Sequence, residues 1–318
     1  MILDWVQVGL GLVILLLAGD VLVKGAVNLA LRLGVSALIV SLTIVAFGTS
    51  APELLIAISA VEEGAAGLAI GNVVGSNTAN VLLVLGIPAL LATLDVSDCD
   101  TRKSYVMMLL ASVLFIGLAF TGVFVFWHGL ILLAALALML LDQAREARSD
   151  RAACASASDN EEEVEGADPD LPGWRIGLFL ALGIAGLPLG AELLVEGATD
   201  IARRAGMSET AIGLTLVAIG TSLPELATTV VAAYRRQADV ALGNVIGSNM
   251  FNLLAIIGIT ALIAPIPVDE LILRLDIWVM LGASLMLAPF VFFGWKMTRV
   301  WGAALSVLYM LYLYVVLA

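Results

Sequence analysis

A seven-residue motif occurs twice in this chain, each time inside a long apolar segment. Gly48–Leu54 reads GTSAPEL, and Gly220–Leu226 reads GTSLPEL. Glycine and proline both weaken a helix, and a carboxylate is costly in an apolar environment. The motif therefore predicts a helix that breaks inside an apolar segment and carries a functional glutamate at the break.

A second motif follows each copy of the first at the same distance. Gly71–Asn80 reads GNVVGSNTAN, and Gly243–Asn252 reads GNVIGSNMFN. Corresponding positions in the two halves are always 172 residues apart, and this spacing also relates Gly25 to Gly197. The chain is therefore a tandem duplication.

The composition excludes an ordinary soluble domain. Hydrophobic residues make up 61% of the 318 residues, charged residues make up 13%, and the mean hydropathy is +1.07. Apolar segments of membrane-spanning length predict five helices in each half and ten in all. Their approximate bounds are 3–23, 35–61, 67–94, 104–120 and 123–141, then 176–195, 208–233, 240–264, 271–293 and 300–317. We expect an all-α membrane protein.

The segment between the halves differs from the rest of the chain. Residues 143–174 contain nine acidic residues and two prolines, which predicts a flexible acidic linker between a first repeat at 1–142 and a second at 175–318. A solvated loop is the favoured interpretation of Glu161–Glu163, and a regulatory ion site there is the alternative. The two cysteines, Cys99 and Cys154, match no metal or redox spacing.

An odd number of spans per repeat predicts that the two repeats cross the membrane in opposite directions. Inverted repeats of this kind are typical of secondary transporters. Three basic residues, Arg203, Arg204 and Arg274, lie on one side of the predicted topology. The other twelve lie on the opposite side, which the positive-inside rule makes cytoplasmic. We therefore expect the central loop inside the cell and both termini outside.

The two motifs contain the side chains of an oxygen-based cation site. Thr49 and Glu53 share a helix face, as do Asn72, Ser76 and Asn80 on the following span. Joining the inverted halves would surround one point with carboxylate, hydroxyl, amide and free carbonyl oxygens. Such a set suits Ca²⁺ or Na⁺, and it argues against zinc or copper because His and Cys are absent from it.

Some of these residues also have a purely structural interpretation. The glycine pairs of the second motif allow close helix packing, and Asn and Ser side chains can join helices by hydrogen bonds. The carboxylates favour an ion site. Neither Glu53 nor Glu225 has a lysine or arginine in its motif, and an unpaired glutamate in a membrane is costly. The only histidine, His128, lies outside both motifs and is interpreted as a packing residue.

The paired motifs resemble the two alpha repeats of the sodium/calcium exchanger family, in the cation/Ca²⁺ antiporter superfamily, and most closely its prokaryotic branch. This resemblance covers essentially all predicted spans. It implies ten transmembrane helices with broken helices at the ion site, and a non-enzymatic antiporter in the cell membrane. Such a protein exchanges Ca²⁺ for Na⁺ by alternating access; these ions are its cargo, and no cofactor or nucleic acid is implied. The implied ion ligands are Glu53 and Glu225, completed by Thr49, Thr221, Ser50, Ser222, Ser76, Ser248, Asn80 and Asn252.

One position departs from the family pattern. Well-known exchangers of this family have an aspartate where this chain has Asn252, so that only two carboxylates face the ions here. The number of Na⁺ ions per cycle and the charge moved are therefore open. A Ca²⁺/H⁺ or K⁺-dependent exchanger on the same scaffold is the alternative. A cation channel is less favoured, because broken helices in inverted repeats are typical of transporters.

Overall fold

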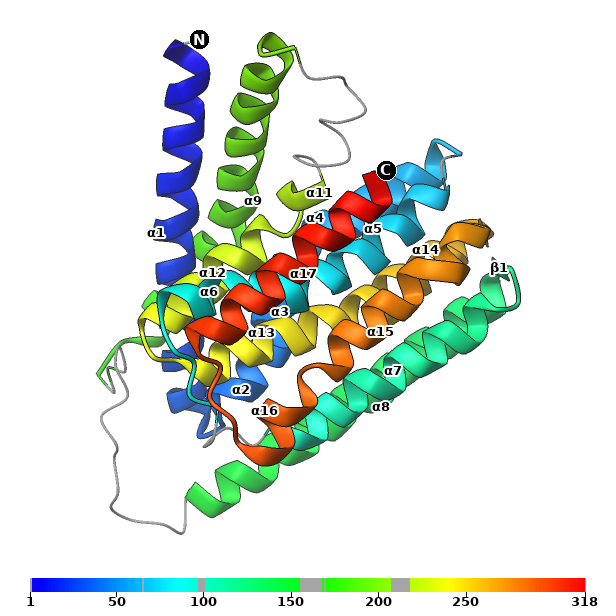
Figure 1. Ribbon diagram of the computed structural model, residues 1–318. Coiled ribbons are helices and arrows are strands. Elements are labelled where there is room, and N and C mark those ends of the chain that lie inside the picture. The colour runs from blue at the N-terminus through cyan, green and yellow to red at the C-terminus, as the bar shows by residue number, and fades with distance from the viewer. Residues whose placement is uncertain are drawn as a thin grey trace.

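Helices form almost all of the computed structural model (Figure 1), which describes residues 2–64, 66–96, 101–154, 168, 170–206 and 218–317. The helices of the first repeat cover five apolar segments, and the second and third of these are interrupted by π-helical turns. Their bounds are α1 (Ile2–Leu33), α2 (Ala37–Val40), η1 (Ser41–Val45), α3 (Ala46–Thr49), α4 (Ala51–Glu62), α5 (Ala66–Ala79), η2 (Asn80–Val84), α6 (Gly86–Leu91), α7 (Arg102–Ala119) and α8 (Phe126–Cys154).

The second repeat follows the same order. Its bounds are α9 (Gly173–Arg204), α11 (Ala218–Gly220), α12 (Leu223–Tyr234), α13 (Ala238–Phe251), η4 (Asn252–Ile256), α14 (Ile257–Ile263), η5 (Ile272–Asp276), α15 (Ile277–Leu285), α16 (Ala288–Phe293) and α17 (Arg299–Leu317). Two short strands, β1 (Val123–Phe124) and β2 (Ile266–Pro267), pair antiparallel and join the repeats at one end.

The number of membrane spans agrees only in part with the prediction. Within the described ranges, eight helices are long and apolar enough to cross a membrane, and the bent pair Ala37–Thr49 and Ala51–Glu62 makes a ninth. The predicted span at 208–233 lies partly outside the described residues, where only α11 and α12 represent it. The tenth span therefore stays a prediction.

The predicted linker begins later than the sequence analysis placed it. Residues 143–154 are not a loop, because α8 continues through them to Cys154. Alanine and arginine dominate this extension, and both favour helix even where the apolar segment has ended. Lys103 of α7 also holds the extended helix, with its Nζ 2.6 Å from Asp142 and 3.1 Å from Glu146. The predictions for Cys99 and for Glu161–Glu163 fall outside the described residues.

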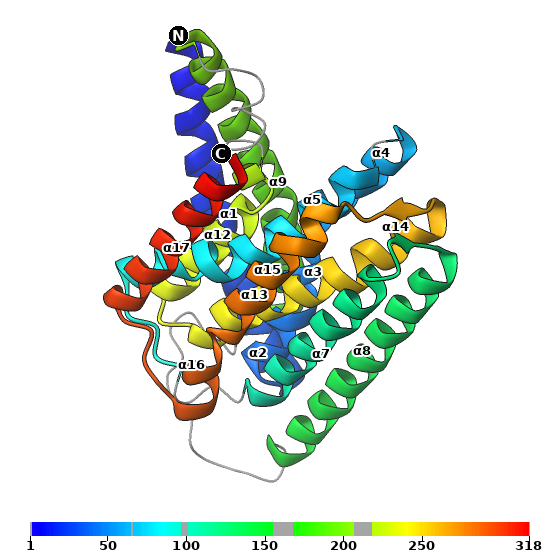
Figure 2. The ribbon, with the colours of Figure 1, turned by 45° about the vertical axis from the view of Figure 1, so that its right-hand side comes forward.

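Contacts between α1 and α9 show that the repeats are inverted. A Cβ on Gly11 of α1 would lie 2.6 Å from the backbone nitrogen of Leu194, so only glycine fits there. The equivalent residue of α9, Gly183, faces Leu22, which is itself equivalent to Leu194. The two helices run antiparallel (Figure 2), and Asp4 near the start of α1 pairs with Arg204 at the end of α9. Equivalent residues thus meet across a pseudo-twofold axis.

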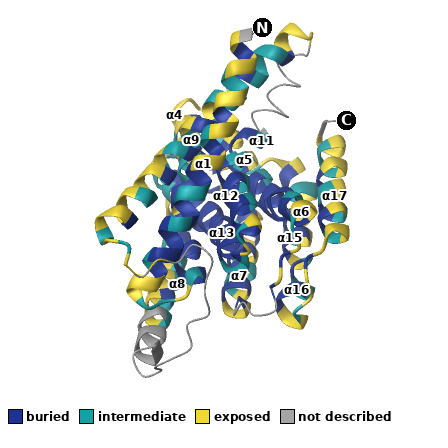
Figure 3. Ribbon diagram, turned by 90° about the vertical axis from the view of Figure 1, so that its left-hand side faces the viewer, coloured by how far each residue is buried: buried dark blue, intermediate teal, exposed yellow. Residues whose placement is uncertain are grey.

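The helices that carry the second motif form the centre of the protein. In both Ala66–Leu91 and Ala238–Ile263, 83% of the apolar window is buried, compared with 17% in Phe126–Glu146 and 22% in Gly173–Arg204. Figure 3 shows α12 and α13 almost entirely buried, with exposed residues on the outer helices. The outer helices are thus expected to face lipid, and the polar motifs lie where neither lipid nor bulk water reaches them.

Candidate ion-binding site

The first motif forms the predicted helix break in both repeats. Ser50 separates α3 from α4 with φ −85° and ψ 7°, and Ser222 separates α11 from α12 with φ −86° and ψ 2°. Pro52 and Pro224 lie in the first turn of the following helix, where a missing N–H costs no hydrogen bond. Each break is followed by a glutamate in the first helical turn, where the helix dipole favours a negative charge.

All ten residues proposed as ion ligands are buried. The exposed fractions of the two carboxylate residues are 1% for Glu53 and 0% for Glu225. These two side chains are close enough for their charges to interact. The neutral residues of the set have exposed fractions of at most 8%, and they are Thr49, Ser50, Ser76, Asn80, Thr221, Ser222, Ser248 and Asn252.

Hydrogen bonds join the motifs of one repeat to those of the other. The Ser50 hydroxyl donates to Oε1 of Glu225 at 3.2 Å. The Thr49 hydroxyl donates to Oδ1 of Asn244 at 3.2 Å and lies 3.4 Å from the Ser248 hydroxyl. Thr49, Ser50, Ser248 and Glu225 therefore form one cluster, as the joining of inverted halves predicts. Among the described residues, Ser76 and Ser222 lie buried in the motifs without a hydrogen bond to a carboxylate.

Several oxygens of the proposed ligands have no hydrogen-bond partner among the described residues. They include both carboxylate oxygens of Glu53 and Oε2 of Glu225, together with Oδ1 of Asn80 and Oδ1 of Asn252. Leaving a charged group buried without a partner costs several kcal/mol, so such atoms indicate a missing counter-charge. A hard cation supplies that charge and accepts all of these atoms as ligands.

Two asparagines at the repeat interface were missed in the sequence analysis. Nδ2 of Asn77 donates to the backbone oxygen of Asn249 at 3.1 Å, and Nδ2 of Asn249 donates back to the backbone oxygen of Asn77 at 3.4 Å. Asn249 also accepts a hydrogen bond from Asn80 at 3.1 Å. The two residues occupy equivalent positions in the duplicated motif, which was the signal available. They were overlooked because they lie off the helix face shared by Ser76 and Asn80.

The π-helical turns are a second feature that residue patterns did not reveal. Turn η2 begins at Asn80 and turn η4 begins at Asn252, which are equivalent positions in the repeats. A π-turn changes the direction of the following side chains and is frequent at functional sites. The turns thus mark the two asparagines at which the central helices leave regular α geometry.

His128 contributes to packing, as the sequence analysis proposed. Its ring lies edge-on to Phe124 with centroids 6.1 Å apart, and its Nδ1 lies 3.5 Å from the backbone nitrogen of Val125.

Inverted halves with broken helices and buried carboxylates between them are the architecture typical of secondary membrane transporters. The chain belongs to the sodium/calcium exchanger protein family, whose model matches residues 3–143 and 176–318. The resemblance drawn from the two motifs is therefore confirmed.

Individual relatives cover nearly the whole chain. The sodium/calcium exchanger MaX1 of Methanosarcina acetivorans is 36% identical, with 96% of each chain covered. The inner membrane protein YrbG of Escherichia coli is 36% identical over 87% of this chain and 85% of its own. A solved structure of the sodium-calcium exchanger NCX_Mj, soaked with 2.5 mM Na⁺ and 1 mM Sr²⁺, matches with a TM-score of 0.83 and 31% identity, covering 99% of this chain and 98% of the other.

Proposed function

We propose that this protein is a secondary active antiporter that exchanges Ca²⁺ for Na⁺ across a prokaryotic cell membrane by alternating access. Membership of the exchanger family and the similarity to MaX1 and NCX_Mj support the substrates. The observation that carries the proposal is the pair of buried carboxylates, Glu53 and Glu225, at the interface of the repeats, where three of their four oxygens have no hydrogen-bond partner among the described residues.

The proposed site supplies two formal negative charges and a shell of neutral oxygens. One Ca²⁺ or two Na⁺ would neutralise Glu53 and Glu225 equally, so the two ions compete for the same charge. Hydroxyl and amide oxygens complete the coordination, because Ca²⁺ takes six to eight oxygen ligands. The proposed neutral ligands are Thr49, Ser50, Ser76, Asn80, Thr221, Ser222, Ser248 and Asn252.

The proposed orientation places both termini outside and the acidic loop in the cytoplasm. It is supported by the twelve basic residues on the side of the central loop. They are Lys24, Arg32, Arg102, Lys103, Arg145, Arg148, Arg151, Arg175, Arg235, Arg236, Lys296 and Arg299.

Ca²⁺ uptake into proteoliposomes tests the coupling ion. Vesicles loaded with Na⁺ and diluted into Na⁺-free buffer containing Ca²⁺ are expected to accumulate Ca²⁺. A pH gradient or a K⁺ gradient alone is expected to drive little uptake. Equal uptake with the pH gradient alone would favour a Ca²⁺/H⁺ exchanger, and Ca²⁺ flux without any counter-ion would favour a channel.

Substituting Asn252→Asp is expected to make Ca²⁺ transport more sensitive to membrane potential and to pH. A third carboxylate either adds a negative charge to the site or must bind a proton to stay neutral, so the equal charge of one Ca²⁺ and two Na⁺ no longer balances the site. The measurement is Ca²⁺ uptake by proteoliposomes at several pH values and at several membrane potentials, each set by a K⁺ gradient with valinomycin. Asn28→Asp, at a buried asparagine of α1 outside the motifs, is the control. Unchanged voltage and pH dependence would place Asn252 outside the ion pathway.

A further inference from the structure

The two repeats differ in how their outer helices meet the broken helices. Helix α1 packs along α12, and it buries Ala227 and Val231 to exposed fractions of 7% and 9%. No comparable packing joins α9 to α4. The residues of α4 that are equivalent to Ala227 and Val231 are therefore uncovered: Leu55 is 66% exposed, and Ser59 is also exposed. The two repeats thus differ in how far the outer helix covers the broken helix.

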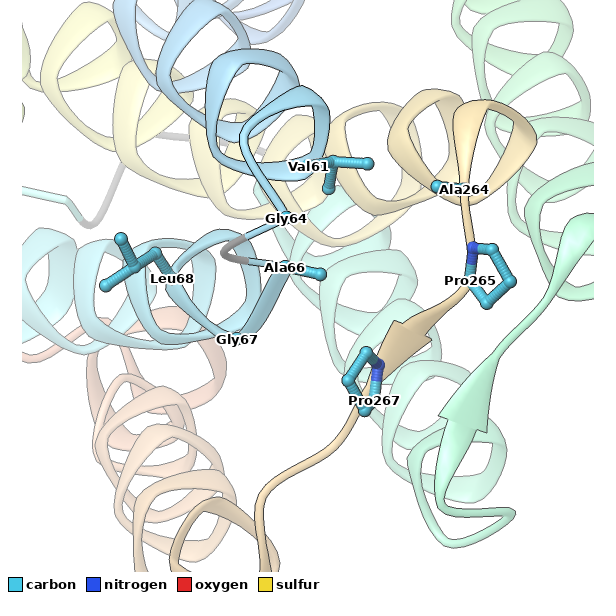
Figure 4. Close-up of a pocket in the computed structure, with 8 residues that line it drawn as sticks. All are labelled: Val61, Gly64, Ala66, Gly67, Leu68, Ala264, Pro265 and Pro267. Carbon is cyan, nitrogen blue, oxygen red and sulfur yellow. The ribbon is translucent and has the colours of Figure 1, made fainter.

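A cavity lies beside the end of each of these two helices, α12 and α4, and the outer helices contribute differently to the two cavities. The cavity beside the end of α12, of about 380 Å³, is lined by Leu16 and Asp20 of α1 together with Tyr234 and Arg235. The cavity beside the end of α4, of about 530 Å³, is lined by no residue of α9 (Figure 4); its lining residues are Val61, Gly64, Ala66, Gly67, Leu68, Ala264, Pro265 and Pro267. Helix α1 thus lines the cavity at the end of α12, whereas its counterpart α9 does not line the cavity at the end of α4.

Charged residues hold α1 in this position. Arg235, which ends α12, donates from Nε to Oδ1 of Asp20 at 2.6 Å and contacts the same carboxylate through Nη2. Lys24, one turn further along α1, lies with its Nζ 2.9 Å from Oδ2 of Asp20. The Arg235 side chain is only 18% exposed, so water screens this ion pair less than one at the surface. We call Asp20, Lys24 and Arg235 the α1 charge cluster.

At the equivalent position in the other repeat, each member of this cluster has an acidic counterpart. The residues equivalent to Asp20, Lys24 and Arg235 are Glu192, Glu196 and Glu63, respectively. The α1 charge cluster therefore carries one negative and two positive charges, whereas the three equivalent residues carry three negative charges. Glu63 and Glu192 are exposed, and neither forms an ion pair with a described residue.

We propose that the α1 charge cluster is a one-sided latch that favours the conformation in which α1 covers α12. In an inverted-repeat transporter, the opposite conformation arises when the two repeats exchange arrangements. There, α1 leaves α12 and the Asp20–Arg235 pair breaks, while α9 approaches α4 and brings Glu192 towards Glu63. The first change loses an attraction and the second adds a repulsion, so both favour the observed conformation. This inference rests on the proposed alternating access.

Thiol labelling tests the latch without ion transport. In a Cys99→Ser/Cys154→Ser background, Val231→Cys places a single thiol on α12. Helix α1 covers this thiol in the observed conformation, and the thiol becomes accessible in the opposite conformation. Its labelling rate by N-ethylmaleimide in lipid nanodiscs, without Ca²⁺, reports how often α1 leaves α12. Asp20→Asn is expected to raise this rate about two- to fivefold, because losing an ion pair worth up to about 1 kcal/mol changes an equilibrium by about fivefold at most. The exchanged pair Asp20→Arg/Arg235→Asp is expected to restore the parent rate.

Glu63→Arg provides the decisive comparison, because this exposed residue lies on α4 and cannot loosen α1 directly. It offers Glu192 an opposite charge in the other conformation, and it is expected to raise labelling at Val231→Cys to a similar extent. An unchanged rate in Asp20→Asn or in Glu63→Arg would overturn the latch. Because the assay involves no flux, its result is separate from the outcome of the Ca²⁺ uptake experiment.

Discussion

Replacing either central glutamate by glutamine is expected to lower Ca²⁺ transport by about a hundredfold or more while leaving the protein folded in the membrane. Glu53→Gln or Glu225→Gln removes half of the formal charge that balances Ca²⁺. Losing one partner of a buried charge pair costs about 3 to 5 kcal/mol, which corresponds to this reduction or more. The measurement is Na⁺-driven Ca²⁺ uptake by proteoliposomes, normalised to the amount of reconstituted protein.

Glu62→Gln is the matched control for this experiment. Glu62 is exposed at the end of α4, the same helix that begins beside Glu53. Its substitution removes the same charge from the same element without touching the buried site, so nearly normal uptake is expected. If Glu53→Gln also transported Ca²⁺ at a nearly normal rate, the proposed ligand set would be wrong.

A methyl group at Gly247 is expected to destabilise the packing of the two repeats. A Cβ at this position of α13 would lie 2.5 Å from the backbone oxygen of Leu42 and 2.6 Å from Cβ of Ala46, both in the first repeat. Backbone cannot move aside as a flexible side chain can, so Gly247→Ala is expected to cost about 2 to 3 kcal/mol. The variant should unfold at a lower temperature, as monitored by size-exclusion chromatography after heating.

Gly117→Ala is the control for the packing prediction. No heavy atom of the described residues lies within 4 Å of a Cβ built on Gly117, which is exposed on α7. Alanine favours helix over glycine by about 1 kcal/mol, so this variant should be as stable as the parent or more stable. Equal stability of Gly247→Ala and Gly117→Ala would contradict the close contact between the repeats.

The sequence predicted the features that depend on local chemistry or on the duplication. Gly48 and Pro52 predicted the helix break, and the identical spacing of Glu53 and Glu225 predicted a shared site between inverted halves. The burial of both carboxylates is confirmed by the structure. The helix breaks and the burial of the carboxylates could be predicted because glycine, proline and an intramembrane charge each restrict the backbone or its environment strongly at one position. The shared ion site itself stays a prediction.

Features that depend on contacts between the repeats could not be predicted in the same way. The hydrogen bonds between Asn77 and Asn249 require the two central helices to cross at one point, which a motif does not specify. The π-turn at Asn80 depends on packing around it. Repeats with equivalent motifs also predict equivalent packing, so the packing of α1 on α12 without a counterpart between α9 and α4 could not be predicted from the motifs.

The extension of α8 has a different cause. The apolar segment ends near Leu141, and the acidic composition that follows was interpreted as a loop. Helix propensity and the ion pairs of Lys103 continue the helix after its apolar face has ended. Hydropathy therefore predicted the membrane-spanning part of this helix but not its end.

Equilibrium binding of radioactive Ca²⁺ to the purified protein tests most directly whether the two halves form one site used in turn by Ca²⁺ and Na⁺. At a Ca²⁺ concentration near half-saturation we expect bound Ca²⁺ to fall as Na⁺ is added, with K⁺ at the same ionic strength having little effect. The same titration of Glu225→Gln should show strongly reduced binding. Ca²⁺ binding that is insensitive to Na⁺, or that is unchanged in Glu225→Gln, would contradict a shared site between the repeats.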